Sequence, residues 1–261
     1  MLQKSILITG AGSGIGAAVA KLFAERRWFV GLYDVNSESV ARIASELGSN
    51  CCHGVMDVTD RDSVRAGLDH FARQSNGRLD ILLNNAGIFE DRAFTEANPA
   101  FLDKMVDVNA KGVVSCAHEA FAMLKETSGS QMINLGSASS IYGVPMEAVY
   151  SSTKFFVRGL SEALRVEWQP FGIGVKLVMP SYVRTPLIAD QDISWADKEN
   201  DKLLDAEDVA ETVWKAAHSD RLYWIIPFEA RLMMSLVRAV PLQWVSKIAA
   251  KLLATGKRES A

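Results

Sequence analysis

The N-terminal part of the chain contains the stretch Thr9-Gly10-Ala11-Gly12-Ser13-Gly14-Ile15-Gly16. An apolar run at residues 6–8 precedes it and a run typical of a helix, residues 17–23, follows it, which predicts a strand, a glycine-rich turn and a helix. Because glycine has no Cβ, such a turn can bring backbone N–H groups close to a phosphate, and the next helix adds partial positive charge. An ordinary tight turn is the alternative, and the stretch alone does not decide between them.

Length and composition indicate one globular domain. The chain has 261 residues, is 49% hydrophobic and 23% charged, and contains no stretch that resembles a linker. The formal net charge of −3 gives no general reason to expect binding to nucleic acid.

The cysteines indicate a reducing compartment. Cys51, Cys52 and Cys116 form neither an even disulfide framework nor a metal-ligand spacing, so we expect no metal site. The first strand is expected within residues 1–8, which leaves no room for a signal peptide, and no apolar run is as long as a membrane span. We therefore expect a cytoplasmic protein that does not span a membrane.

Strand and helix patterns alternate along the chain. Strands are expected at residues 6–8, 28–33, 51–55, 79–83, 131–135, 175–179 and 222–226. Helices are expected between most of them, at residues 17–27, 37–47, 60–74, 113–126, 148–168 and 205–218. This order predicts an α/β fold with a doubly wound parallel sheet of seven strands, in which ligands bind beyond the carboxyl ends of the strands.

Asp34 ends the second expected strand, where the adenosine ribose of a bound dinucleotide would lie. Its carboxylate can accept hydrogen bonds from the 2′- and 3′-hydroxyls and would repel a 2′-phosphate. Ser13 and Val35 are uncharged, so neither of these neighbouring positions would attract that phosphate. We therefore expect NAD rather than NADP as the cofactor, with a simple turn-forming role for Asp34 as the alternative.

Two further loops follow strands at the same edge of the sheet. Asp57, next to Val58, could accept a hydrogen bond from the adenine amino group or cap the helix expected from Asp60, and both interpretations remain open. Asn84-Asn85-Ala86-Gly87 follows the fourth strand, where small residues would let the nicotinamide half of the cofactor pass close to the chain. A loop without a ligand is the alternative there. The expected contacts are Asn84, Ala86 and Gly87.

Tyr150 and Lys154 are four residues apart at the start of a helix, and Ser137 lies just past the fifth strand. The helical spacing places the first two on one face, so all three groups can converge at one edge of the sheet. For a tyrosine to act as a base near neutrality, its pKa must fall by about three units, which corresponds to about 4 kcal/mol of stabilisation of its ionised form. An ammonium at about 4 Å supplies about that much at an effective dielectric of about 20, so we expect Lys154 to lower the pKa of Tyr150.

Taken together, these motifs resemble those of the classical short-chain dehydrogenase/reductase family. The resemblance covers residues 5 to about 227: the turn matches TGxxxGxG, residues 84–87 match NNAG, and Ser137, Tyr150, Lys154 and Asn109 fall at the positions of the catalytic tetrad. It implies a Rossmann-fold enzyme with Tyr150 as general acid/base and Ser137 holding the substrate oxygen. Lys154 would lower the tyrosine pKa and bind the nicotinamide ribose, and Asn109 would hold a water molecule in a proton relay. Dimers or tetramers are also implied.

The resemblance extends the expected cofactor site and marks one departure from the family. Around the glycine turn, the expected contacts are Gly10, Gly12, Ser13, Gly14, Ile15 and Gly16. After the sixth strand the family pattern is PGxVxTP, and this chain has Pro180-Ser181-Tyr182-Val183-Arg184-Thr185-Pro186. Pro180, Val183 and Thr185 would border the nicotinamide amide. Ser181 replaces the family glycine, so the local backbone and the substrate-side wall need not follow the family.

The C-terminal part of the chain differs in charge from the rest. We expect a catalytic NAD-binding domain at residues 1–228 and a basic tail at residues 229–261, where six basic residues stand against two acidic ones. Apolar residues form two helical stripes in the tail, one on each side of Pro241. Such a pair of helices could cover the substrate pocket, form a subunit interface, or contact an anionic membrane surface peripherally.

The sequence as a whole predicts an NAD-dependent dehydrogenase that interconverts a secondary alcohol and a ketone. Apolar candidates for the pocket wall suggest a lipophilic substrate such as a sterol or a fatty alcohol; they are Val144, Pro145, Met146 and Tyr182. A regulatory or scaffold protein that binds NAD on the same fold is the alternative, because a fold does not determine a function.

Overall fold

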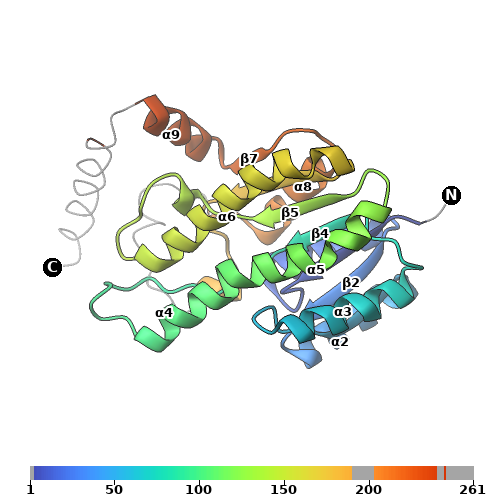
Figure 1. Cartoon of the computed structure of the whole chain (residues 1–261). Coiled ribbons are helices and arrows are strands. Elements are labelled where there is room, and N and C mark those ends of the chain that lie inside the picture. Colours follow the sequence, from blue (N-terminus) through green and yellow to red (C-terminus); the bar gives the residue numbers. More distant parts are fainter. Residues whose placement is uncertain (1–2, 190–202, 240–243, 245–261) are drawn as a thin grey trace.

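The computed structural model describes residues 3–189, 203–239 and 244, and its strands form one parallel sheet in the order β3-β2-β1-β4-β5-β6-β7 (Figure 1). The strands are β1 (Ser5–Thr9), β2 (Phe29–Asp34), β3 (Cys51–Val55), β4 (Ile81–Asn84), β5 (Gln131–Leu135), β6 (Gly174–Pro180) and β7 (Tyr223–Ile226). The predicted doubly wound, seven-stranded parallel sheet is confirmed. The order reverses direction between β1 and β4, which creates the crevice where ligands bind in such sheets.

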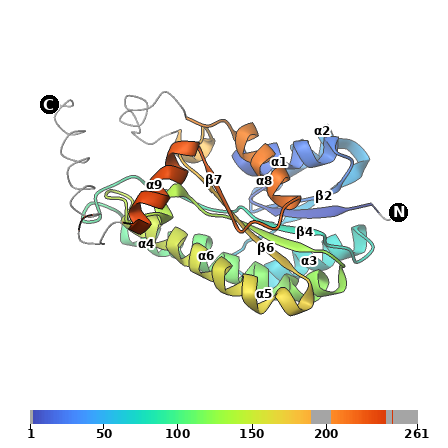
Figure 2. The ribbon, with the colours of Figure 1, turned by 90° about the horizontal axis from the view of Figure 1, so that it is seen from above.

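Helices cover both faces of the sheet (Figure 2). The α-helices are α1 (Gly14–Glu25), α2 (Ser37–Leu47), α3 (Arg61–Gln74), α4 (Pro99–Val106), α5 (Gly112–Glu126), α6 (Ala148–Glu167), α8 (Ala206–Ala217) and α9 (Phe228–Ala239). Short helical segments are η1 (Gly48–Asn50), η2 (Asp107–Lys111), η3 (Ala138–Ser140), η4 (Gln169–Phe171) and η5 (Pro186–Ile188).

Alternation of side chains along the strands divides the core between the two faces. Ile6 and Ile8 of β1 pack with α1, α2 and α8, whereas Leu7 between them packs with α3 and α5. All three are fully buried. Figure 2 shows the same two layers, with α1, α2 and α8 on one side and α3, α5 and α6 on the other. The burial of both faces explains why the strands are almost continuously apolar.

The segments before α5 and α3 resolve two points of the sequence prediction. The helix expected from residue 113 begins at Gly112 as α5, but it is preceded by a helix that was not predicted. Asn98 caps this helix, α4, by accepting from the Ala100 N–H, and α4 continues through the π-helical segment η2 into α5. Asp60 is the N-cap of α3 and accepts from the Asp62 N–H, so Asp57 does not cap this helix. That alternative for Asp57 was wrong.

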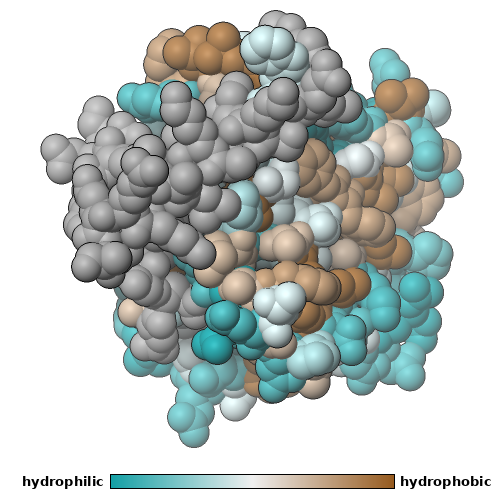
Figure 3. All heavy atoms as spheres, turned by 90° about the vertical axis from the view of Figure 1, so that its left-hand side faces the viewer, coloured by the Kyte–Doolittle hydropathy of each residue, from teal (hydrophilic) through white to brown (hydrophobic). Residues whose placement is uncertain are grey.

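The helix α9 belongs to the tail and packs on the body of the molecule. Its Ala230, Met234 and Val237 lie against a cluster that includes Met179 and Ile225. Its other apolar side chains are exposed; they are Phe228, Leu232, Met233 and Leu236. The helix α9 lies near the top of the view in Figure 3. The second predicted stripe lies almost entirely outside the described residues. Within those residues, no helix has both the length and the apolar character needed to cross a membrane.

Candidate active site

The glycine turn between β1 and α1 forms a cradle that tolerates no larger residue. Gly14 has a φ of +50°, and a Cβ on Gly16 would lie 2.3 Å from the Gly10 carbonyl oxygen. The Ala11 N–H donates to the Tyr33 carbonyl and ties the turn to β2. The first turn of α1 contains no acidic residue, and the side chain of its N-cap, Ser13, makes no capping hydrogen bond. The helix N-terminus therefore keeps N–H groups available for a phosphate, and the turn fits a dinucleotide.

Asn85, which was not among the predicted contacts, holds this turn in place. Its Nδ2 donates to the carbonyls of Thr9 at 3.0 Å and Gly10 at 2.9 Å, and its backbone N–H donates to Thr9 Oγ1 at 3.1 Å. The predicted contact Asn84 instead lies buried inside the sheet, where its Nδ2 donates to Asn134 Oδ1 at 2.8 Å. Successive side chains along a strand point to opposite faces of the sheet, and this alternation could have indicated that the side chains of Asn84 and Asn85 point in different directions.

Asp34 ends β2 and Asp57 follows β3, as expected, but both carboxylates already accept hydrogen bonds. Asp34 Oδ2 accepts from the Gly12 N–H at 2.9 Å, and its Oδ1 accepts from the Asn36 N–H at 3.0 Å. The carboxylate therefore lies directly against the glycine turn. Asp57 Oδ1 accepts from both the N–H and the hydroxyl of Thr59, at 2.9 and 2.7 Å. Val58, beside it, is buried.

Ser137, Tyr150 and Lys154 converge at the carboxyl end of β5. Tyr150 and Lys154 lie in the first two turns of α6, and the lysine Nζ is 5.5 Å from the centroid of the tyrosine ring. Lys154 Nζ donates to the Leu135 carbonyl at 3.0 Å, at the end of β5. Ser137 follows this strand and hydrogen-bonds to Tyr150, and Phe89 meets the tyrosine ring edge-on at a centroid distance of 4.7 Å.

Burial determines the protonation of both groups on α6. It raises the pKa of Tyr150, the charge of Glu147 raises it further, and only the hydrogen bond with Ser137 lowers it. Burial also lowers the pKa of Lys154 to about 8. The Lys154 ammonium donates to the Leu135 carbonyl and lies 5.5 Å from the centroid of the Tyr150 ring, so the expectation that Lys154 lowers the tyrosine pKa stays a prediction. Near neutral pH, Tyr150 is therefore a protonated acid beside a largely protonated lysine.

Asn109 is buried in η2 and clamps the loop that follows β4. Its Oδ1 accepts from the Ile88 N–H and its Nδ2 donates to the Ile88 carbonyl, both at 2.8 Å. Nδ2 also lies 3.3 Å from Thr153 Oγ1 on α6. A Cβ on Gly87 would lie 3.3 Å from Asn109 Oδ1 and 3.8 Å from Lys154 Nζ, so the small residue lets these three segments meet.

The loop after β6 brings its predicted residues to the same edge. Pro180 ends β6, Val183 is buried and forms a bridge with Leu204, and a Cβ on Gly14 would lie 3.1 Å from the Thr185 side chain. The loop therefore borders the glycine turn. Ser181 donates its N–H to the Ile226 carbonyl at 2.9 Å, and its φ is not positive, so serine fits where the family has glycine.

Glu147 is a buried acid beside Tyr150 that sequence reasoning missed. It is 2% exposed and occupies the N-cap position of α6, three residues before the tyrosine. Its Oε2 accepts from the Ser139 hydroxyl at 2.7 Å, and its Oε1 accepts from the Tyr182 hydroxyl. Burial raises the pKa of this carboxyl. Its position one helical turn before Tyr150 is the signal that could have identified it.

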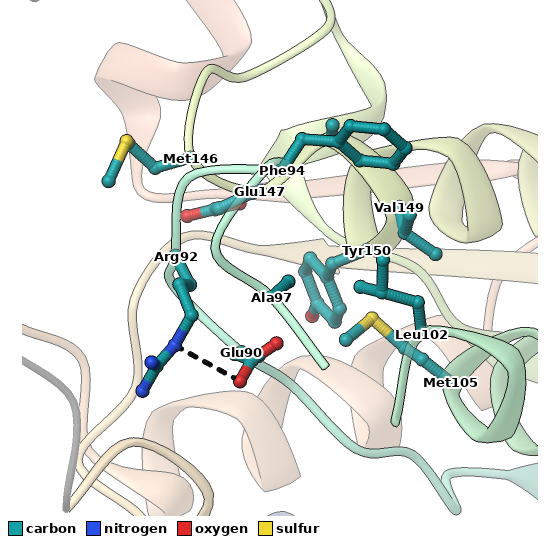
Figure 4. Close-up of a pocket in the computed structure, with 11 residues that line it drawn as sticks. Glu90, Arg92, Phe94, Ala97, Leu102, Met105, Met146, Glu147, Val149 and Tyr150 are labelled. Carbon is teal, nitrogen blue, oxygen red and sulfur yellow. Dashed lines mark ion pairs between the residues drawn. The ribbon is translucent and has the colours of Figure 1, made fainter. Parts of the chain in front are cut away.

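Tyr150 and Glu147 open onto a pocket (Figure 4). The pocket is lined by Glu90, Arg92, Phe94, Ala97, Leu102, Met105, Met146, Glu147, Ala148, Val149 and Tyr150. Met146 is thus the one predicted apolar wall residue that lines it. Figure 4 shows Glu90, Arg92 and Glu147 on one side of the Tyr150 ring, and Leu102, Met105 and Val149 on the other. Among the described residues, no group of three or more His, Cys, Asp or Glu could hold a metal ion.

Known proteins are similar to this chain in sequence and in fold. The family model of short chain dehydrogenases matches residues 4–194. Cis-4-hydroxycyclohexanecarboxylate dehydrogenase of Sinomonas cyclohexanicum is 35% identical over 190 residues, which are 72% of this chain and 76% of that protein. Oxidoreductase UcpA of Escherichia coli K12 is 34% identical over 188 residues, which are 70% of this chain and 71% of UcpA.

Two solved structures are similar in fold as well as in sequence. A 3-ketoacyl-(acyl-carrier-protein) reductase from Brucella melitensis, complexed with NADH, has a TM-score of 0.80 and 28% identity, over 87% of this chain and 98% of that one. ElxO with NADP bound has a TM-score of 0.77 and 28% identity, over 86% of this chain and 97% of that one. With the family match over most of its length, the chain is an oxidoreductase that belongs to the short-chain dehydrogenase family.

Proposed function

We propose that the protein transfers a hydride between NAD(H) and a secondary alcohol or ketone with a lipophilic body. The observation that carries this proposal is the convergence of Ser137, Tyr150 and Lys154 at the carboxyl end of β5, on the same edge of the sheet as the glycine turn. A fold alone does not determine a function, but three groups suited to carbonyl and alcohol chemistry support this reaction.

The choice of NAD over NADP rests on this chain's own residues, since the two similar structures contain different cofactors. Asp34 directs Oδ2 at the Gly12 N–H, so its negative charge lies at the turn that would hold the cofactor. A carboxylate there suits ribose hydroxyls and repels a 2′-phosphate. Ser13 and Val35 beside it carry no charge that would offset this repulsion.

When bound, the nicotinamide ring accepts or supplies the hydride. Tyr150 exchanges the proton of the substrate oxygen, and its raised pKa makes it a proton donor at rest, as ketone reduction requires. Ser137 would hold the same oxygen through its hydroxyl. Lys154 would hold the nicotinamide ribose and supply positive charge when Tyr150 loses its proton. We also propose that Asn109 holds a water molecule that links Lys154 to solvent.

The apolar side of the pocket supports a lipophilic substrate body. Phe94 and Leu102 line it beside Tyr150, and Phe94 is exposed although it is large and apolar. Burying such side chains against a hydrocarbon is favourable by about 25 cal/mol for each Å² removed from water. A sterol, a fatty alcohol or a cyclic alcohol would cover this surface.

We further propose that the enzyme is a homodimer or homotetramer. Large apolar side chains on α6 are exposed, among them Phe156 at 48% and Val166 at 70%. Exposed apolar residues gathered on one helix are typical of interfaces. Light scattering after size exclusion tests the subunit number, and a monomer at micromolar concentration would contradict this proposal.

NAD reduction over a panel of secondary alcohols tests the function, with wild type and Tyr150→Phe compared. We expect turnover with wild type and its near-complete loss in the variant, because the proton donor is removed while the ring packing on Phe89 is kept. Tyr223→Phe, at the opposite end of the strands, is the matched control and should keep its activity. Turnover that survives Tyr150→Phe would refute the mechanism, and tight NAD binding without any turnover would favour a regulatory protein.

A further inference from the structure

The pocket next to Tyr150 contains more negative than positive charge. Glu90 and Glu147 line it, and the charge of Asp91 acts on both Glu147 and Tyr182. Arg92 is the one cationic side chain among the residues that line this pocket. The side of the pocket that faces the substrate oxygen is therefore net acidic.

Glu147 is held in a way that suits an ionised carboxylate. Two hydroxyls, those of Ser139 and Tyr182, donate to its two oxygens, so both oxygens act as acceptors. Being 2% exposed, the group is poorly screened by water, and its charge acts strongly on anything that enters the pocket. A carboxylate on the substrate would meet repulsion here.

Glu90 and Arg92 form an ion pair that leaves one acceptor unused. Arg92 Nε lies 3.3 Å from Glu90 Oε1, and this pair is marked in Figure 4. Glu90 Oε2 is buried and has no hydrogen-bond partner in the described part of the chain. A buried carboxylate oxygen without a partner is unfavourable, so a hydrogen-bond donor on a ligand would stabilise it.

The positive charge of Arg92 is offset by Glu90, because Arg92 Nε lies 3.3 Å from Glu90 Oε1. The pocket thus differs from one that binds a carboxylate, in which an unpaired cation would be expected. One relative of this chain is named for a carboxylate substrate, cis-4-hydroxycyclohexanecarboxylate. The acidic groups described above argue that this chain acts on a different class of alcohol.

We propose that the pocket selects a secondary alcohol that carries a second hydroxyl on its apolar body, and that Glu90 and Glu147 exclude carboxylates. The inference rests on the proposed dehydrogenase function and adds the substrate class to it. Glu90 Oε2 accepts the hydrogen bond of the second hydroxyl, on the side of the Tyr150 ring where Glu147 also lies.

Three cyclohexanols that differ only at position 4 test the proposal: 4-methylcyclohexanol, cyclohexane-1,4-diol and 4-hydroxycyclohexanecarboxylate. We expect kcat/KM with NAD to be highest for the diol and lowest for the carboxylate, with about tenfold or more between these two. Glu90→Gln leaves Arg92 unpaired and should raise kcat/KM for the carboxylate about tenfold or more, with a smaller effect on the methyl compound. Glu126→Gln removes an exposed carboxylate at the far end of α5 and should change none of the three values.

A wild-type enzyme that oxidises the carboxylate as well as the diol would overturn the inference, as would an unchanged preference in Glu90→Gln. If Glu90→Gln does not fold, Arg92→Gln replaces it and should weaken use of the carboxylate further. If none of the three alcohols reduces NAD, the proposed function fails for this class. Calorimetric titration of the same three compounds into the NAD-loaded protein then tests the pocket alone, and carboxylate binding as tight as diol binding refutes the charge selection.

Discussion

Replacing Asn109 by alanine tests whether this residue is a structural clamp. The substitution removes hydrogen bonds to the N–H and the carbonyl of Ile88, both 2.8 Å long, and the longer contact with Thr153. The side chain of Asn109 is 1% exposed, so water does not simply replace it. Each buried backbone group left without a partner costs about 1–3 kcal/mol, and because Ile88 is only partly buried we expect a loss of about 2–4 kcal/mol in the free energy of unfolding.

Urea unfolding at fixed protein concentration measures this loss, with two matched variants. Asn36→Ala removes an exposed cap of α2 and should cost only about 1 kcal/mol. Asn109→Asp keeps an acceptor for the Ile88 N–H but loses both donors, and it also buries a charge. Its loss of unfolding free energy should therefore lie between those of Asn36→Ala and Asn109→Ala, or exceed both. If Asn109→Ala loses activity but less than about 0.5 kcal/mol of stability, the clamp is refuted and the residue acts only through the proton relay.

Three further predictions concern the cofactor site and the buried lysine. Gly16→Ala should weaken NAD binding at least about tenfold, because its Cβ would lie 2.3 Å from the Gly10 carbonyl oxygen. Gly159→Ala is the control, since its Cβ would meet nothing within 4 Å, and it should leave NAD binding unchanged. A fluorescence titration measures both affinities. Asp34→Ser should reduce the preference for NADH over NADPH from about tenfold or more to near parity, and comparable affinities in wild type would contradict the role of this carboxylate. Burial lowers the pKa of Lys154 to about 8, below its usual value, so the unfolded chain holds this proton to higher pH than the folded one. The contribution of this group to the free energy of unfolding therefore rises from about pH 8 to about pH 10. The difference in unfolding free energy between wild type and Lys154→Met, measured by urea unfolding, should show this rise, and a difference that does not change with pH would be evidence against it.

The fold was predictable because its signals are local and repeated. Each buried strand is an apolar run bounded by turn residues, and the alternation with helices leaves a parallel sheet as the arrangement that buries both faces. The helix α4 was missed, because η2 and its polar residues interrupt the helical pattern between α4 and α5. Most of the tail lies outside the described residues, so the predictions for it stay predictions.

The site was predictable in its members more than in their contacts. Spacing alone brought Ser137, Tyr150 and Lys154 to one edge, and the structure agrees. It could not tell which of two adjacent amides faces the glycine turn, because that depends on how β4 sits in the sheet: Asn85 reaches the turn and Asn84 does not. Nor could it find that Asn109 hydrogen-bonds to Ile88, a contact across 21 residues of chain.

By itself the sequence determined the sheet, the glycine turn and the identity of the groups that carry the chemistry, since strand ends and helix spacing follow from local pattern. Only the tertiary structure decided the electrostatics. Tyr150 holds its proton because it is buried beside Glu147, and the Lys154 ammonium is directed to the Leu135 carbonyl. Charge interactions depend on distance and on exclusion of water, and both are set by segments that meet only in the folded chain.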